Sequence, residues 1–198
     1  MVLALFWAAA TDTMNVPLGV GIFFELLWLD LIPIGTYLPP HSIFSTFAAL
    51  VATTYFGLTD PTKILIVMIL CVPLAFFGAR VEAYARQLQN RNYNKIIGWA
   101  RKEKATSEFP QNLILKTILF QTFFAFVTFA ATIPALLWVL SIIFQWFGHE
   151  IVSIRFSWPI LWFFASIGGL LALRLRRAYY FVSILVAIGC LIVLLVRY

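Results

Sequence analysis

The sequence predicts an all-α, polytopic membrane protein with about five or six spanning helices and a discontinuous, re-entrant helical segment near residues 15–41. Three observations predict this class. Hydrophobic residues make up 63% of the 198 residues and charged residues only 11%, with a mean hydropathy of +0.96, whereas about a quarter of a soluble domain is charged. The uncharged residues form runs close to the length of a membrane span. Prolines and glycines interrupt the acidic stretch between residues 15 and 41.

The excess of basic over acidic residues fits a membrane protein better than a nucleic-acid-binding protein. The net charge is +6, from 14 Lys and Arg against 8 Asp and Glu, and in so apolar a chain the basic residues are explained as cytoplasmic loop charge. We therefore expect membrane lipid as a partner and no nucleic acid. Cys71 and Cys190 lie inside apolar runs, so no metal site, cofactor or disulfide framework is predicted.

Uncharged runs of about 20 residues, the length that crosses ~30 Å of hydrocarbon, place the spans. The spans predicted from these runs lie at about 42–58, 62–79, 112–132, 156–173 and 178–196, within a single transmembrane domain covering residues 1–198. In the first run, Ser42 is the predicted N-cap and Gly57 the predicted end. Asp60 and Pro61 form a turn suited to the start of the second run.

One uncharged run, 117–149, is too long for one span and short for two. Pro134 is expected to divide it, because proline removes a helical hydrogen bond. On this interpretation 112–132 crosses the membrane and 135–147 lies in the interface or re-enters it. A single long tilted helix kinked at Pro134 is an alternative of comparable weight.

The basic residues orient the chain. Seven Lys and Arg residues cluster in segment 80–108, which is therefore predicted to be cytoplasmic. A second basic turn near residues 174–177 is expected on the same side. We interpret segment 80–108 as a basic helical surface that touches anionic lipid, in preference to a docking surface for a specific protein.

The stretch from Asn15 to His41 predicts a partial helix. Pro17 suits a helix start, and the prolines from Pro33 onward stop the helix near Ile32. A proline-rich irregular segment must then run at membrane depth, where it is tolerated only beside protein or a water-filled cavity. Discontinuous helices of this kind build binding sites in transporters.

The same stretch carries the candidate binding residues. Residues 1–62 contain no Lys or Arg that could neutralise Glu25 or Asp30, and an acid inside the membrane indicates a functional site. On a helix, Gly21, Glu25 and Trp28 share one face. This combination suits a sugar, because a carboxylate accepts hydroxyl hydrogen bonds, an indole stacks on a pyranose, and a glycine leaves room for ligand or a close helix.

Each candidate has a structural alternative. Glu25 is assigned to ligand contact in preference to a structural acid, because the cost of burying its charge needs a reason. Asp30 points about 140° away from Glu25, so ligand contact and a helix-end tether have equal weight. Trp28 is more often a packing residue. His41 is assigned equally to a loop hydrogen bond and to substrate contact. Thr36 completes the candidate substrate-binding set.

Residues 19–46, GVGIFFELLWLDLIPIGTYLPPHSIFST, resemble the membrane subunit IIC of the mannose/sorbose class of bacterial phosphotransferase systems. The shared pattern is a small-residue turn, the Glu-Leu-Leu-Trp-Leu run, Pro-Ile-Gly and a following Pro-Pro. The stretch VPLAFFGARVEAYARQLQNRN at 72–92 is similar to the family's apolar helix with a basic end.

The resemblance implies a permease subunit in the sugar translocation path of a phosphoenolpyruvate-dependent system for a mannose/sorbose-class hexose. It implies a bacterial cytoplasmic (inner) membrane location, an oligomer with a IID-like membrane subunit, soluble phosphocarrier A and B subunits as partners, and no catalytic residues in this chain. It also suggests Glu25 as the family's acid beside the sugar.

The chain departs from the family in two places. It begins one helix into the family pattern, so that only Asp12 corresponds to the family's amino-terminal acidic region, and Pro33 stands where members carry a polar side chain. The alternative function is a non-transporting scaffold or regulatory module derived from such a subunit.

Overall fold

The computed structural model describes residues 1–29, 38–100, 111–147 and 156–172. These residues form six α-helices and no strand, which confirms the predicted all-α class. The helices are α1 (Val2–Thr11), α2 (Asn15–Leu27), α3 (Ser42–Tyr55), α4 (Pro61–Ala100), α5 (Gln111–Phe147) and α6 (Trp158–Ala172). The predicted span at 178–196 lies outside the described residues.

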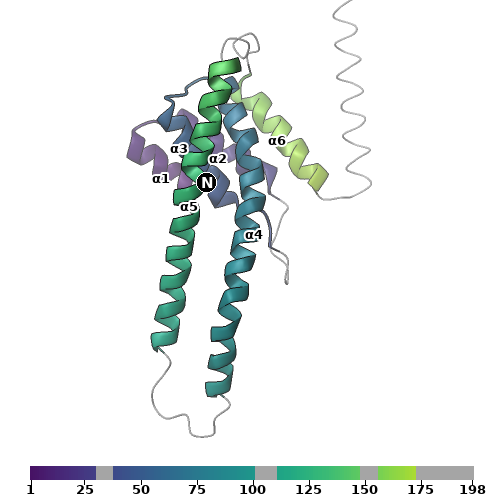
Figure 1. Cartoon of the computed structure of the whole chain (residues 1–198). Coiled ribbons are helices and arrows are strands. Elements are labelled where there is room, and N and C mark those ends of the chain that lie inside the picture. The colour runs from purple at the N-terminus through teal and green to yellow at the C-terminus, as the bar shows by residue number, and fades with distance from the viewer. Residues whose placement is uncertain (30–37, 101–110, 148–155, 173–198) are drawn as a thin grey trace, which may run out of the picture.

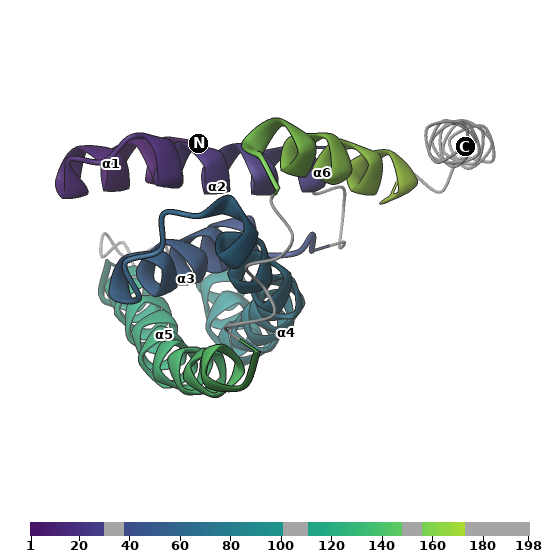
Figure 2. The ribbon, with the colours of Figure 1, turned by 90° about the horizontal axis from the view of Figure 1, so that it is seen from above.

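The helices are arranged in layers around α3. Figure 2 shows α1, α2 and α6 in one layer, α3 beneath them, and α4 with α5 on the far side. In Figure 1 the long helices α4 and α5 run side by side and extend well past the short helices. The short helices therefore pack against only one end of the α4–α5 pair.

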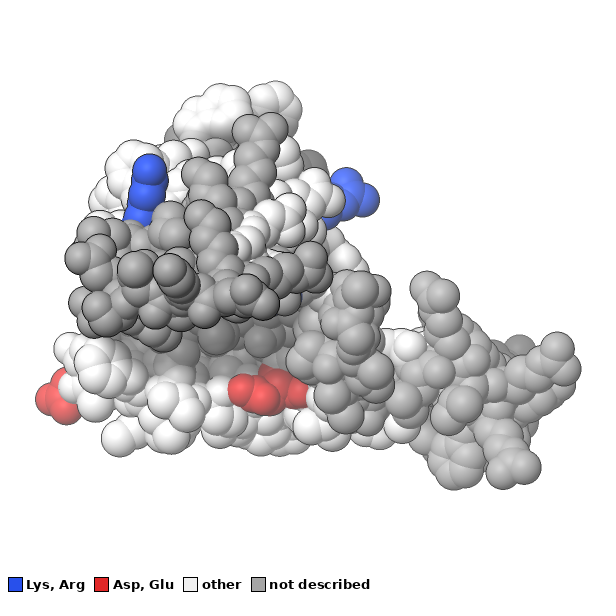
Figure 3. Space-filling model, turned by 90° about the horizontal axis from the view of Figure 1, so that it is seen from below, with Lys and Arg blue, Asp and Glu red and all other residues white. Residues whose placement is uncertain are grey.

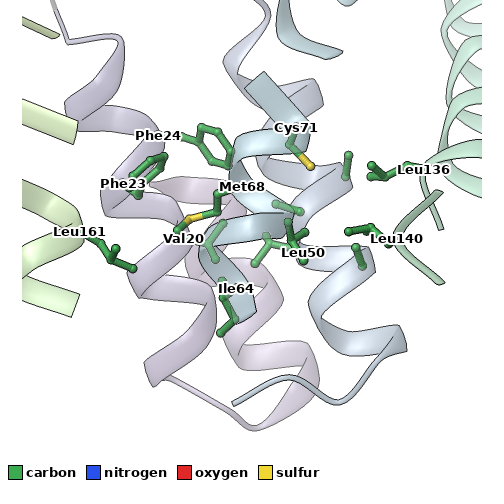
Figure 4. Packing of buried hydrophobic residues seen from close by; sticks show 14 of the residues in the cluster. Val20, Phe23, Phe24, Leu50, Ile64, Met68, Cys71, Leu136, Leu140 and Leu161 are labelled. Carbon is green, nitrogen blue, oxygen red and sulfur yellow. The ribbon is translucent and has the colours of Figure 1, made fainter. Parts of the chain in front are cut away.

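The core lies where α3 meets its neighbours. Phe24 of α2, Leu50 of α3, Met68 of α4, Leu140 of α5 and Leu161 of α6 are all buried in one cluster (Figure 4). The described helices from α2 to α6 thus each contribute a large apolar side chain to the same core.

Small residues on α3 explain its central position. Ala48, Ala49 and Ala52 are buried, and they let neighbouring helix backbones approach closely. On the other side of the core, Gly169 of α6 meets the backbone of α2: a Cβ built on Gly169 would lie 2.5 Å from the carbonyl oxygen of Leu26. Close backbone contact therefore fixes the packing of α6 on α2.

The predicted boundary between α3 and α4 is confirmed. Gly57 adopts a left-handed conformation with φ of +59°, and the N–H of Leu58 donates to the carbonyl of Thr53 at 2.9 Å, the geometry of a glycine-terminated helix. Asp60 then accepts a hydrogen bond from the N–H of Thr62 at 3.0 Å, with Pro61 as the first helical residue.

The start of α3 differs from the prediction. The N-cap is His41, and its Nδ1 accepts a hydrogen bond from the N–H of Phe44 at 3.1 Å. Ser42 is instead the first helical residue. Either side chain can satisfy a free amide at a helix start, and the imidazole of His41 does so here.

The partial helix predicted after Asn15 is present but shorter than expected. It ends at Leu27 instead of near Ile32, and Trp28 is its C-cap. Its 13 residues extend over ~20 Å, less than the thickness of a bilayer core. The proline-rich segment that follows, residues 30–37, lies outside the described residues.

The expected division at Pro134 is wrong. Helix α5 is continuous from Gln111 to Phe147 with Pro134 inside it, as the single-helix alternative proposed. Proline removes only one backbone hydrogen bond, and Leu136 and Leu140 anchor the following turns in the core. Segment 135–147 is therefore not a separate helix.

Helix α4 also runs past its predicted end. It contains Pro73 and continues to Ala100, so the basic segment from residue 80 starts as an extension of the apolar helix. By length and composition, two helical stretches among the described residues are suited to cross a membrane: Pro61–Asn90 and Ile114–Trp146. The other described helices are shorter, so five or six spans are not confirmed.

Candidate functional site

The first turn of α3 separates two recesses. The Glu25 recess has a volume of about 580 Å³ and is lined by Met1, Val2, Leu3, Phe6, Glu25, Ser42, Ile43 and Thr46. The His41 recess lies between α3, α4 and α5, has a volume of about 130 Å³, and includes His41, Glu82, Gln121 and Thr128 in its lining. Residues of one helical turn therefore reach both recesses.

Glu25 lies in the last turn of α2, at the edge of the Glu25 recess. Its side chain is 55% exposed, so it is not the buried acid that the sequence predicted. Its carboxylate pairs with the amino group of Met1. Although residues 1–62 contain no Lys or Arg, the acid therefore has a cationic partner in this structure.

The Glu25 recess combines one acid, two hydroxyl groups and an apolar wall. Ser42 and Thr46 lie one turn apart on α3, and Val2, Phe6 and Ile43 supply apolar surface. A carboxylate accepts hydrogen bonds and a hydroxyl both donates and accepts them. The volume of the recess falls in the range of about 300–1,000 Å³ that is typical of small-molecule sites. The recess can therefore accommodate a hydroxylated small molecule.

Gly21 and Trp28 do not join Glu25 in this recess. A Cβ built on Gly21 would lie 2.6 Å from the Cβ of Ala4, so the space beside Gly21 is filled by α1. The ring of Trp28 stacks on Phe24 with 5.1 Å between ring centroids. Of the two roles that the sequence allowed for Gly21, room for a ligand or for a close helix, the structure shows the close helix. Trp28 packs against Phe24 of the same helix.

His41 faces the second recess. Its side chain caps α3 by accepting the hydrogen bond from Phe44. In addition, the backbone N–H of His41 donates to the backbone carbonyl of Ala75 at 3.0 Å, which ties the start of α3 to α4. Its Nε2 lies 3.8 Å from Oε2 of Glu82. His41 therefore makes the loop-fixing hydrogen bond that the sequence allowed, and it also presents a ring nitrogen to a cavity.

Glu82 is a polar residue of the site that sequence reasoning missed, because it was included in the basic segment 80–108. It is paired with Arg86 one turn later, at 2.5 Å. The spacing of this pair in the sequence was one available signal. A second signal was the glycine at position 78, one turn before Glu82. In the structure, a Cβ added to Gly78 would lie 3.2 Å from the Cβ of His41. This small residue lets α3 approach α4 beside Glu82.

Helix α5 supplies neutral polar groups to the His41 recess. Gln121 accepts a hydrogen bond from Gln89 of α4 at 2.9 Å, so its amide NH₂ can still donate. The hydroxyl of Thr128 donates to the carbonyl of Phe124 and retains its lone pairs as acceptors. The recess thus offers both donors and acceptors.

Figure 3 shows the visible acidic side chains over the layer of α1 and α2, and the visible basic side chains over α4 and α5. Asp30 and Thr36, the remaining predicted site residues, lie outside the described residues. Within the described residues, no group of three or more His, Cys, Asp and Glu residues could hold a metal ion.

Comparison with known proteins adds no assignment. No protein-family model, curated protein or solved structure matches this chain.

Proposed function

We propose that this chain is a membrane permease subunit of the IIC type, which forms part of the translocation path for a mannose/sorbose-class hexose in a phosphoenolpyruvate-dependent phosphotransferase system. The observation that carries the proposal is the position of Glu25 on a half-length helix, beside a recess that also contains Ser42 and Thr46. A carboxylate and two hydroxyls are the groups that bind sugar hydroxyls, and a discontinuous helix is a common way to place them in a transporter.

The exposed surface of α5 supports a membrane location. Only 11% of its apolar stretch is buried. Its exposed large side chains include Leu115, Phe123, Phe126, Trp138 and Trp146. In water such a surface would drive aggregation, whereas lipid or an apolar partner helix stabilises it. We propose a multi-pass protein of the bacterial cytoplasmic membrane, with segment 80–108 on the cytoplasmic side.

The proposed partners follow from the same function. A IID-like membrane subunit would cover part of the apolar surface of α5 in an oligomer, and soluble A and B subunits would carry the phosphate. In this proposal the chain supplies the sugar path, and the phosphate chemistry belongs to the soluble subunits.

Uptake measurements test the role of Glu25. Cells that express the chain with a IID-like subunit and the A and B subunits should accumulate radiolabelled mannose or sorbose, and Glu25→Gln should abolish uptake without lowering the amount of protein in the membrane. Asp60→Asn is the matched control, because Asp60 lies at the start of α4, asparagine can keep its capping hydrogen bond, and Asp60 does not line the recess. Equal loss in both variants would count against a specific role for Glu25.

The alternative is a non-transporting scaffold or regulatory module, and the positions of Gly21 and Trp28 favour it. Both residues of the predicted sugar face are used for packing, against Ala4 and Phe24. Co-purification separates the two functions. A stoichiometric complex with a IID-like subunit supports the permease, whereas a stable lone protein that binds neither radiolabelled sugar supports the scaffold.

A further inference from the structure

An apolar groove lies between α3 and α5, which adjoin along one side of the structure (Figure 2). Its volume of about 550 Å³ falls in the range of about 300–1,000 Å³ that is typical of small-molecule sites. The described residues that line it are all apolar: Ile43 and Phe47 of α3, and Phe126, Phe129, Ala130, Ile133 and Pro134 of α5. Because such a wall offers no side-chain hydrogen bond to a hydroxylated ligand, the groove suits a hydrocarbon chain and not a sugar.

Aromatic packing holds the walls of the groove together. The ring of Phe129 packs against Phe44 and Phe47 of α3, with 4.6 and 5.3 Å between ring centroids. Ile43 and Phe126, by contrast, are 60% and 70% exposed. The α3–α5 groove is therefore built into the contact between the two helices, and a ligand can enter it from the surface.

An exposed apolar stripe connects the groove with a cation on the same helix. Leu119, Phe123 and Phe126 follow one another at spacings of four and three residues, which places them on one side of α5, and all three are exposed. Lys116 is also exposed and lies on this side, seven residues before Phe123. Ten residues of helix, ~15 Å, separate Lys116 from Phe126. In a bilayer with ~30 Å of hydrocarbon, the tails of one leaflet reach ~15 Å inward, so the charge and the groove are one tail length apart.

Lys116 lies at the end of the α4–α5 pair that carries further basic positions. Gln89 of α4 is hydrogen-bonded to Gln121 of α5 at 2.9 Å. Lys116 lies five residues before Gln121, and Arg91 and Lys95 lie two and six residues after Gln89. Because the two helices run antiparallel, these three basic positions are at a similar level. This is the end that we propose to be cytoplasmic, and the cytoplasmic leaflet contains anionic lipids, whose headgroups attract basic residues.

We propose that the α3–α5 groove binds a tail of an anionic phospholipid of the cytoplasmic leaflet, with the phosphate of this lipid beside Lys116. The tail lies along Leu119 and Phe123, and its end enters the groove. Van der Waals contact with the apolar walls holds the tail, and the charge of Lys116 selects an anionic headgroup. This inference rests on the proposed membrane location, and it does not depend on sugar transport.

Native mass spectrometry on the full chain in detergent micelles tests the site without any sugar. The delipidated protein is mixed with phosphatidylglycerol, or with phosphatidylcholine that has the same tails, and the fraction of protein that retains a lipid is measured as a function of lipid concentration. Phosphatidylglycerol should bind about fivefold more tightly, because only its headgroup carries a net negative charge. Equal binding of the two lipids would overturn the proposal.

A substitution at the cation tests headgroup recognition. Lys116→Gln should weaken the binding of phosphatidylglycerol about fivefold and leave the binding of phosphatidylcholine unchanged. Lys63→Gln is the control, because Lys63 lies in the first turn of α4, at the opposite end of this helix from Lys95. A preference for phosphatidylglycerol that Lys116→Gln leaves unaltered would remove Lys116 from the site.

A matched pair of alanines tests the groove. Ala130→Trp places an indole in the groove and should weaken the binding of both lipids. Ala131→Trp is the control, because Ala131 is the next residue of α5, is equally classed as exposed and does not line the groove. Ile43 is left unaltered, since it also lines the Glu25 recess. Equal lipid binding by the two tryptophan variants would show that the tail does not occupy the groove.

The same spectra detect a protein occupant of the groove. A lipid-free dimer that Ala130→Trp dissociates and Ala131→Trp does not would show that a second copy of the chain covers the groove, and it would overturn the proposal. Cell fractionation tests the membrane location separately. Recovery of the chain in the soluble fraction would contradict that location, whereas a membrane-bound chain without lipid selectivity would contradict only the lipid site.

Discussion

Gly21 of α2 lies directly against Ala4 of α1, so closely that a Cβ built on Gly21 would be 2.6 Å from the Cβ of Ala4. This contact joins the two short helices on the side of α2 that sequence reasoning assigned to a ligand. A glycine beside a candidate acid therefore has a packing role, and in the proposed sugar path the polar groups that join Glu25 are Ser42 and Thr46 of α3.

Substitution of Gly21 tests the contact. Gly21→Ala should destabilise the protein by about 1–3 kcal/mol, because the new methyl group overlaps Ala4 and forces α1 and α2 apart. The melting temperature of the detergent-solubilised protein, followed by circular dichroism, measures the effect. Gly98→Ala is the control, since an added Cβ there meets nothing within 4 Å, and it should be neutral or slightly stabilising. Equal melting temperatures for the two variants would contradict the packing role of Gly21.

Neighbouring glycines of α6 make a second comparison. A Cβ on Gly169 would meet the backbone carbonyl oxygen of Leu26 at 2.5 Å, whereas a Cβ on Gly168 would meet only the end of the Leu27 side chain at 2.8 Å. A side chain can rotate away and a backbone cannot, so Gly169→Ala should lower the melting temperature more than Gly168→Ala. The reverse order would show that α6 does not pack on α2 as described.

The start of α4 depends on the Asp60 side chain. Asp60→Ala should cost about 1 kcal/mol of stability, because the N–H of Thr62 loses its acceptor. Asp60→Asn retains an amide oxygen in the same place and should keep most of the stability. Chemical denaturation in detergent compares the two variants. An alanine variant as stable as the asparagine variant would rule out the cap.

The hydroxyl of Thr46 provides a functional prediction that rests on the proposed sugar path. Thr46→Val keeps the shape of the side chain and removes one hydrogen-bonding group from the Glu25 recess. Uptake of radiolabelled mannose or sorbose should fall about three- to tenfold, the effect of one neutral hydrogen bond.

Thr53→Val on the same helix is the control for this measurement. The Thr53 hydroxyl donates a hydrogen bond to the carbonyl of Leu50, and Thr53 does not line the Glu25 recess. Uptake should therefore not change in this variant. Unchanged uptake in Thr46→Val would exclude its hydroxyl from the sugar path.

Local signals predicted some helix boundaries well. Gly57 ends α3 and the Asp60-Pro61 turn begins α4, because glycine conformation and side-chain capping act within a few residues. Pro134 misled the prediction for the opposite reason. The effect of a proline on a helix depends on what holds its two halves, and the buried Leu136 and Leu140 lie in a core that no local pattern reveals.

The residues of the candidate site also divide into those that the sequence predicted and one that only the tertiary structure revealed. Glu25 and His41 were predicted because an acid and a histidine are conspicuous in an apolar stretch, and both line a recess. Glu82 was missed because its neighbours in the sequence are basic, and only the approach of α3 to α4 brings it near His41.

The sequence by itself determined the all-helical class, the short helix before the proline-rich segment and the turn between α3 and α4, since composition and capping are properties of neighbouring residues. Only the tertiary structure decided that α1 fills the space beside Gly21 and that the first turn of α3 separates two recesses. The physical reason is that these features arise from contacts between different helices, which depend on how whole surfaces pack together.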